Sequence, residues 1–214
     1  DGSFAEITAH VAANGWTNTR VIQSGHNGGY GAGNNVGIRA GMSDGTKPDY
    51  VYILNSDAFP KPGAIRVLYD HLNTAPETGF AGSFIMGEDD VQHTTTFRFP
   101  SILGEFEGSV GFGPVSKLLK SYRVPRELSQ TAQVDWLAGA SVMMRQSVLD
   151  EIGLFDEAFF LYFEETDLCR RAQKAGYRVM FMADSVVMHL GSVSTGLKEW
   201  TRVPDYWFAS RWYY

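Results

Sequence analysis

Cysteine is almost absent from this chain of 214 residues, and what the sequence lacks excludes several classes of protein. The single cysteine, Cys169, allows no internal disulfide and no cysteine-based zinc site. No apolar run approaches the roughly 18 residues that a membrane-spanning helix needs. The chain opens Asp1-Gly2-Ser3, without the basic and apolar segments of a secretory signal. Basic residues number 18 against 24 acidic ones, which disfavours a nucleic-acid-binding protein because phosphate binding needs a basic surface.

What is present indicates one α/β domain. The apolar run from Asp49 to Leu54 is typical of a strand buried on both faces, and Pro62 suits the first turn of a following helix. This alternation of strand, turn and helix predicts a mostly parallel sheet flanked by helices. Further strands are expected over 19–23 and 177–182, further helices over 3–13, 34–40, 147–152 and 164–175, and a glycine- and proline-rich insertion over 82–133.

Two polar turns follow predicted strands, where ligands bind in such sheets. The glycine-rich turn from Gly25 to Gly33 could bring backbone N–H groups to an anion, or it could simply be a tight turn. Asn55-Ser56-Asp57 follows the buried strand. Asp57 is placed to hold a hard cation that bridges a diphosphate, but the same three residue types also form helix-capping turns.

Three carboxylates, on Glu164, Glu165 and Asp167, fall within one helical turn. Acidic residues are favoured at a helix N-terminus, and Asp167 is spaced to pair with Arg171. Alternatively, one carboxylate is a general base whose pKa is raised by the aromatic residues before it. His189 is either an ordinary hydrogen-bonded histidine or, if Asp57 binds a metal, a second ligand. The aromatic tail over 200–214 suits packing on the core, sugar binding or a membrane interface.

Four motifs follow one another along nearly the whole chain. They are Asn27-x-Gly-x-Gly-Ala-Gly-Asn-Asn-x-Gly; Leu54-Asn55-Ser56-Asp57 with Pro60-x-Pro62-Gly63; Gly139-Ala140 with Gly153-x-Phe155-Asp156-Glu157; and Glu164-Glu165-Thr166-Asp167-Leu168-Cys169-Arg170-Arg171 leading to Ala175-Gly176-Tyr177 and His189. In order and spacing they resemble the family 2 glycosyltransferases, especially the bacterial rhamnosyltransferase-like branch.

The resemblance implies a GT-A fold, an α/β domain over residues 1–214 that lacks the family's N-terminal strand-helix-strand. It implies an inverting, metal-dependent transferase that moves a sugar from a nucleotide-diphosphate donor, with dTDP-rhamnose a candidate, to a glycan or lipid-linked glycan acceptor. Cell-surface polysaccharide synthesis, a cytoplasmic location and peripheral association with the inner face of the membrane are expected on the same basis. The oligomeric state is left open.

Residue roles follow from the same resemblance. Glu165 stands at the position of the family's aspartate base, and because the pair here is Glu-Glu rather than Glu-Asp, Glu164 is the alternative. Asp57 and His189 would bind Mn²⁺ or Mg²⁺. The residues implied in donor or acceptor binding are Asn27, Gly31, Asn34, Asn55, Gly139, Ala140 and Arg171.

Two other functions remain open from the sequence. A catalytically inactive domain of the same fold would bind a glycan or a partner without needing nucleotide or metal. A nucleotidyltransferase is weakened by the absence of a glycine-rich loop with a basic residue to hold a triphosphate.

Overall fold

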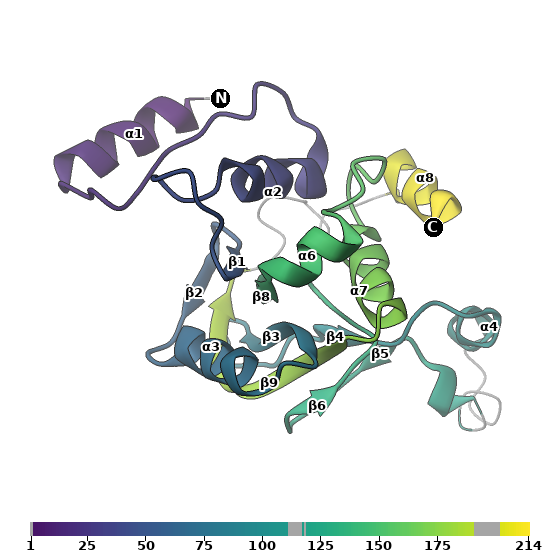
Figure 1. Cartoon of the computed structure of the whole chain (residues 1–214). Helices are drawn as coiled ribbons and strands as arrows, with labels where there is room; N and C mark the ends of the chain where they lie inside the picture. Colours follow the sequence, from purple (N-terminus) through teal and green to yellow (C-terminus); the bar gives the residue numbers. More distant parts are fainter. Residues whose placement is uncertain (1, 111–116, 118, 191–201) are drawn as a thin grey trace.

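A six-stranded sheet runs through the part of the chain that the structure, a computed structural model, describes: residues 2–110, 117, 119–190 and 202–214 (Figure 1). Its strand order is β1-β8-β3-β9-β2, with β6 pairing with β9 beside this path, and a smaller sheet has the order β5-β4-β7. The strands are β1 (Tyr50–Leu54), β2 (Ala58–Pro60), β3 (Thr78–Met86), β4 (Thr96–Phe97), β5 (Pro125–Arg126), β6 (Ala132–Gln133), β7 (Trp136–Leu137), β8 (Ser141–Arg145) and β9 (Arg178–His189).

Helices cover both faces of the large sheet. α3 packs against β3, β8 and β9, whereas α6 contacts β8 and α7 contacts β9 from the other side (Figure 1). In the described residues no helix is long and apolar enough to cross a membrane. The helices are α1 (Ser3–Ala13), α2 (Gly29–Ala40), α3 (Ala64–Thr74), α4 (Ile102–Val110), α6 (Gln146–Ile152), α7 (Glu164–Lys174) and α8 (Asp205–Tyr213), with a 3-10 helix, η1 (Lys120–Tyr122).

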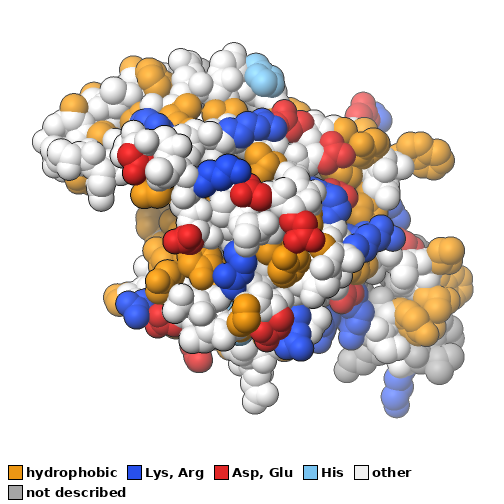
Figure 2. Space-filling view, in the orientation of Figure 1, with side chains coloured by type: hydrophobic (Ala, Val, Ile, Leu, Met, Phe, Trp, Pro, Cys, Tyr) orange, Lys and Arg blue, Asp and Glu red, His pale blue; other side chains and the backbone are white. Residues whose placement is uncertain are grey.

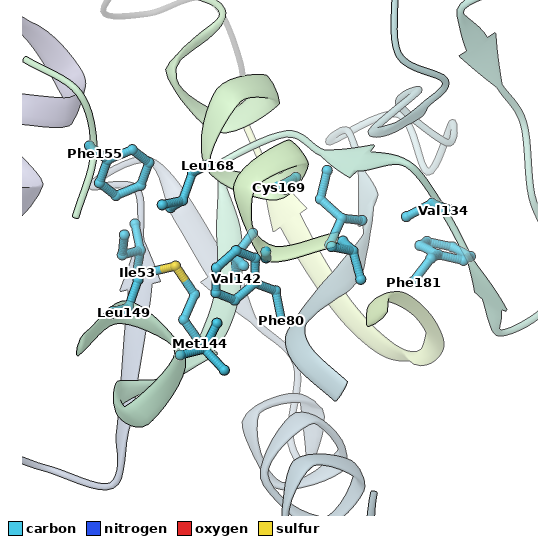
Figure 3. Close-up of a cluster of buried hydrophobic side chains, with 14 residues drawn as sticks. Ile53, Phe80, Val134, Val142, Met144, Leu149, Phe155, Leu168, Cys169 and Phe181 are labelled. Atoms are coloured by element: carbon cyan, nitrogen blue, oxygen red, sulfur yellow. The ribbon is translucent and has the colours of Figure 1, made fainter. Parts of the chain in front are cut away.

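The buried core divides according to the two faces of the sheet. Neighbouring residues of a strand point to opposite faces, so Met144 joins the cluster that contains Leu149 of α6 and Leu168 of α7. Met143 joins the cluster that contains Leu68 of α3. Figure 3 shows the first of these clusters, which lies between the sheet and the helices α6 and α7. Burial on both faces explains why β8 is almost continuously apolar. The expectation that β1 is buried on both faces was wrong: it lies at the edge of the sheet, most of its residues are only partly buried, and Leu54 is exposed.

The sheet is mixed, so the expectation of mostly parallel pairing was wrong. β3 and β9 are parallel, but β8 is antiparallel to both β1 and β3, and β2 is antiparallel to β9. A continuous apolar run indicates burial on two faces, and it does not fix the direction of the neighbouring strand. The expected α/β class, with helices flanking the sheet, is confirmed.

This mixed pairing brings several strand ends to one edge of the sheet. β1 and β3 both oppose β8, and β3 runs with β9, so β1, β3 and β9 share one direction. Their carboxyl ends therefore meet at one edge, where β8 begins. At that edge Leu54, the last residue of β1, pairs with Ser141, the first residue of β8.

Most of the expected elements are confirmed with changed ends. The helix expected from Asn34 or Asn35 begins five or six residues earlier, at Gly29, and the strand expected over 177–182 continues to His189. The segment 82–133 is more regular than expected, because it contains the end of β3 together with β4, α4, β5 and β6. Residues 111–116 and 118 of that segment, and residues 191–201 before α8, lie outside the described residues.

The strand expected over 19–23 was wrong. These residues form neither helix nor strand, and Ile22 is exposed. A short alternating segment becomes a strand only when another strand pairs with it, and within the described residues none does. Arg20 instead donates hydrogen bonds of 2.8 Å to the carbonyl groups of Ala40 and Gly41, at the end of α2.

Charged side chains of both signs are interspersed on the face of the molecule that Figure 2 shows. Exposed ion pairs among the described residues include Arg39 with Glu157, 2.8 Å apart, and Lys47 with Asp150, 2.7 Å apart. Pairs as exposed as these contribute little to stability. In each pair the positive charge of the basic side chain is offset by a neighbouring carboxylate.

A chain of four hydroxyl groups crosses the large sheet. Tyr52 of β1 lies 2.9 Å from the Ser141 hydroxyl of β8, which lies 2.7 Å from Ser83 of β3, and Ser83 lies 2.8 Å from Ser185 of β9. Ser185 donates to the carbonyl of Ala64 in α3. Because each hydroxyl has one hydrogen, this last bond fixes the direction of the others, each hydroxyl donating to the next.

We expect Ser83→Ala to lower the free energy of unfolding by about 1–3 kcal/mol, because Ser141 then keeps a buried donor without an acceptor. Urea unfolding should show a lower midpoint with an unchanged slope. Ser24→Ala is the control, since the Ser24 hydroxyl bonds to the His26 carbonyl in an exposed loop. Equal midpoints for the Ser83 variant and the wild type would contradict the hydroxyl chain.

Candidate active site

Asp57 and His189 meet where β1 and β9 end. Asp57 lies in the turn between β1 and β2, and pairing of β2 with β9 places Ala58 opposite His189. The Asp57 Oδ1 and His189 Nε2 atoms are 3.0 Å apart, and both side chains are largely buried. The Asn55 amide nitrogen lies 3.4 Å from the same imidazole nitrogen. The local fold therefore gathers a carboxylate, an imidazole and an amide at one point.

These side chains fit a divalent cation. A carboxylate and an imidazole together suit Mn²⁺, and Mg²⁺ sites often use one or two carboxylates plus substrate phosphates. In the described residues, no group of three His, Cys, Asp or Glu side chains forms a metal site. Asp57 and His189 would be the ligands at this point.

A second group of residues surrounds Gly139. The Tyr30 hydroxyl donates to the Gly139 carbonyl over 2.7 Å, and the Gly139 N–H donates to Glu165 Oε1 over 3.1 Å. A Cβ atom at position 139 would lie 2.1 Å from the Tyr30 hydroxyl oxygen and 2.9 Å from Glu165 Oε1. The packing therefore requires glycine at this position.

The two groups are adjacent. The Asn55 N–H donates to the Ala140 carbonyl over 3.0 Å, and Ala140 follows Gly139 directly. One continuous path therefore runs from Asp57 and His189 through Asn55 and Ala140 to Gly139 and Glu165. Residues from four distant parts of the sequence form one site at the edge of the sheet.

The two neighbouring glutamates have different surroundings. Glu164 is only 1% exposed, and its Oε2 atom has no hydrogen-bond partner in the described part of the chain. Burial raises the pKa of Glu164 to about 9, and the charge of Glu165 adds to the rise. Burial also raises the pKa of Glu165, while its own N–H and that of Gly139 oppose the rise. At neutral pH, Glu164 is therefore protonated, whereas Glu165 is the one of the two glutamates that is partly exposed.

The backbone is strained just before this pair. Tyr162 and Phe163 have φ angles of 69° and 73°, in the left-handed region that bulky residues rarely adopt. Aromatic residues of α8 pack on them: the Tyr206 ring is stacked 6.4 Å from Tyr162, and Trp207 meets Phe163 edge to face at 6.1 Å. Part of the aromatic tail thus packs on the loop that leads to Glu164 and Glu165.

The residues of the glycine-rich motif hold α2 in place. Asn27 Oδ1 accepts from the Gly29 N–H over 3.1 Å, and the Asn34 amide donates to the Tyr30 carbonyl over 3.0 Å. A Cβ atom at Gly31 would lie 3.0 Å from Phe155, so glycine lets α2 approach that residue closely. The expected donor- or acceptor-binding roles of Asn27, Gly31 and Asn34 stay predictions.

Arg171 makes structural contacts that the motif did not indicate. Its guanidinium group pairs with Asp167 at 2.8 Å, as the spacing predicted, and it also donates to the carbonyl groups of Ile152, Gly153 and Leu154. These contacts tie α7 to the end of α6 and engage the nitrogen atoms of the side chain. The geometry thus favours a role in holding α7 over the expected contact with donor or acceptor.

Sequence reasoning missed two residues that build the site. Tyr30 stood as an unspecified position between glycines, although a large aromatic residue in such a segment is a signal of close packing. Asn35 is fully buried; its amide donates to the Phe155 carbonyl and to Glu157, and its oxygen accepts from the Phe155 N–H. It therefore ties α2 to the loop that precedes α7.

Comparison with known proteins gives a consistent result. A family model described as "Glycosyltransferase like family 2" matches residues 4–203. The N-acetylglucosaminyl-diphospho-decaprenol L-rhamnosyltransferase of Mycobacterium tuberculosis is 31% identical over 206 residues, which cover 92% of this chain and 66% of the relative. Rhamnosyltransferase WbbL of Escherichia coli is 25% identical over 188 residues, covering 86% of this chain and 67% of the relative. The chain spans about two thirds of the length of these relatives.

A solved structure is similar in fold. The crystal structure of GalNAc-T7 with UDP, GalNAc and Mn²⁺ superposes with a TM-score of 0.50 and 12% identity, covering 75% of this chain and 30% of that one. At this identity the likeness shows the fold alone. It confirms the expected GT-A-like α/β fold.

We expect Glu164→Gln to stabilise the protein increasingly as pH rises from about 5 to about 9. In this range the wild-type Glu164 is protonated when folded and ionised when unfolded. Wild-type stability therefore falls by up to about 1.4 kcal/mol per pH unit on account of this group, whereas glutamine binds no proton. Urea unfolding at several pH values measures the difference.

Below pH 4.5 the difference between variant and wild type should become constant, because Glu164 is then protonated in both states. Glu127→Gln is the control, since Glu127 is exposed. A difference that does not change between pH 5 and pH 9 would show that Glu164 is ionised in the folded protein.

Proposed function

The chain belongs to the family 2 glycosyltransferases, and on that premise we propose that it catalyses metal-dependent transfer of a sugar, with inversion, from a nucleotide-diphosphate donor to an acceptor hydroxyl. The observation that carries the proposal is the continuous path from the Asp57–His189 pair through Asn55 and Ala140 to Glu165. We propose that one end of this path, the Asp57–His189 pair, binds a cation that stabilises the leaving diphosphate. The other end, Glu165, takes the proton of the acceptor. Residues 1–214 are proposed to act as one GT-A-like domain.

Asp57 and His189 would hold the divalent cation, Mn²⁺ or Mg²⁺, with Asn55 beside them. When bound, the cation supplies positive charge that stabilises the leaving diphosphate. Asn55, Gly139 and Ala140 lie between the Asp57–His189 pair and Glu165, so we propose that they contact the donor and acceptor sugars.

Glu165 is proposed as the general base. As the acceptor oxygen forms its bond to the anomeric carbon, its proton passes to the Glu165 carboxylate, and the electron pair of the breaking carbon–oxygen bond leaves with the diphosphate. A raised pKa suits this role, because a base is most effective when its pKa lies near the working pH. A single displacement of this kind inverts the configuration. Double displacement would need a second, nucleophilic carboxylate, and Glu164 is buried and protonated.

The names of the relatives support a narrower proposal. Two of them are rhamnosyltransferases, and one name specifies a decaprenol-linked acceptor. We therefore propose dTDP-rhamnose as a donor to test first, and a lipid-linked glycan as the acceptor class. For such an acceptor we propose a location in the cytoplasm, at the inner face of the membrane.

We expect Glu165→Gln to reduce sugar transfer by a factor of about 10²–10⁴ while leaving donor binding intact, because the amide cannot take the acceptor proton. Initial rates with the nucleotide sugar, together with donor binding by calorimetry, measure the two effects. Glu127→Gln serves as the matched control on an exposed position. Unimpaired turnover in the Glu165 variant would remove this residue from the role.

We expect Mn²⁺ together with dTDP or UDP to raise the melting temperature of the wild type, and the rise to vanish in Asp57→Asn. A ligand at a hundredfold excess over its Kd stabilises by about 2.7 kcal/mol, which moves Tm by several degrees. Asp184→Asn is the control, because Asp184 is exposed on β9 away from the strand end. A shift of equal size without Mn²⁺ would contradict the proposed metal dependence, and no shift with any nucleotide would favour the inactive binding domain.

A further inference from the structure

Two hydrogen bonds fix the backbone on both sides of Gly139. Its carbonyl accepts from the Tyr30 hydroxyl over 2.7 Å, and its N–H donates to Glu165 Oε1 over 3.1 Å. The carbonyl and the N–H belong to different peptide groups, so the first bond restrains ψ and the second restrains φ. A glycine without such restraints adopts a wide range of both angles.

Tyr30 is itself held rigidly. Its N–H donates to the Phe160 carbonyl over 3.1 Å, and its ring meets Phe155 edge to face at 5.9 Å. Gly29 permits this approach: its φ is +88°, and a Cβ atom there would lie 1.7 Å from the Phe160 oxygen. The tyrosine hydroxyl is therefore a fixed point from which the Gly139 backbone is oriented.

The hydroxyl also keeps its proton. Burial, together with the charges of Glu165 and Glu164, raises the pKa of Tyr30 well above its ordinary value of 10. At neutral pH it can only donate to the Gly139 carbonyl, which has no hydrogen to offer. The direction of this bond is therefore fixed.

We propose that Tyr30 is a positioning residue for the base: its hydroxyl, acting through the Gly139 backbone, aims the Gly139 N–H at Glu165 Oε1 and so sets the orientation of that carboxylate. This rests on the proposed function of Glu165. Tyr30 takes no proton from the acceptor, and its contribution is the geometry of the group that does.

Loss of the Tyr30 hydroxyl should change the pKa of Glu165 in a defined direction. The Gly139 N–H favours the ionised form of Glu165, so weakening this bond raises the pKa of Glu165. The titratable groups that face Glu165 from the described elements are Tyr30 of α2, together with Glu164 and Cys169 of α7. Burial raises the pKa of Glu164 to about 9 and that of Cys169 to about 12, and it raises the pKa of Glu165 as well.

The test is Tyr30→Phe, which keeps the ring and removes the hydroxyl. In ¹³C- and ¹⁵N-labelled protein, the carboxyl carbon of Glu165 and the amide of Gly139 should titrate together in the wild type. In the variant we expect the midpoint to rise by up to about one pH unit, which is the effect of losing the Gly139 N–H bond to the charged carboxylate completely. Glu165→Gln identifies the signal, and Tyr177→Phe, which removes a hydroxyl bonded to Glu151 at the surface, is the matched control.

Kinetics give a second readout. In Tyr30→Phe, kcat should fall about tenfold on the acidic side of the profile and recover at higher pH, with the donor KM unchanged. Incorporation of 3-fluorotyrosine at position 30 keeps both ring and hydroxyl, and its more acidic hydroxyl should move the midpoint downward. This second variant decides the matter if Tyr30→Phe fails to fold.

An unchanged Glu165 midpoint in both folded variants would overturn the role of Tyr30. If the midpoint moves as expected but the wild type transfers no sugar from any donor, the positioning contact stands and the proposed function fails. If transfer depends on Glu165 but the Glu165 midpoint is the same in the variants and the wild type, the proposed function stands and only the role of Tyr30 is lost.

Discussion

The antiparallel insertion of β8 between β1 and β3 is the constraint on which the candidate site depends. Because β8 runs against both neighbours, its first residue, Ser141, lies beside Leu54 at the end of β1. Gly139 and Ala140 therefore emerge where Asn55 and Asp57 follow β1. Had β8 run parallel to β1, its start would lie at the opposite edge, about 17 Å away for five residues at 3.3 Å each. The base and the proposed cation site would then belong to different ends of the molecule.

The same geometry explains why two neighbouring glutamates have different surroundings. Adjacent residues of a helix point about 100° apart, so only one side chain of the pair can face the Gly139 loop. Glu165 takes that direction, while Glu164 points toward the side where Gly31 lets α2 pack closely. Exclusion from water holds Glu164 in its neutral form, so Glu164 adds no negative charge next to Glu165. One carboxylate is thereby selected without any difference in residue type.

The sequence located residues that meet at this site better than it predicted how the fold brings them together. Asn55 and Asp57 could be found because polar residues after a buried strand are a local signal, and the Asp167–Arg171 pair because its spacing is local. The direction of β8, the failed strand at 19–23 and the contact of Tyr30 with Gly139 depend on partners far along the chain. The spacing of 109 residues between Tyr30 and Gly139 leaves no periodic trace in either segment.

The strained turn before α7 shows how a distant helix takes part in the site. Left-handed φ angles at Tyr162 and Phe163 cost on the order of 1–3 kcal/mol each, and such strain persists only where surrounding contacts impose it. Here α8 supplies them, since Tyr206 stacks on Tyr162 and Trp207 packs on Phe163. The strained residues directly precede Glu164 and Glu165. Packing by α8 therefore influences the direction in which α7 begins, and with it the orientation of the proposed base, Glu165. The aromatic residues of α8 therefore affect the site indirectly, through the backbone that precedes α7. Trp212 of the same helix is exposed.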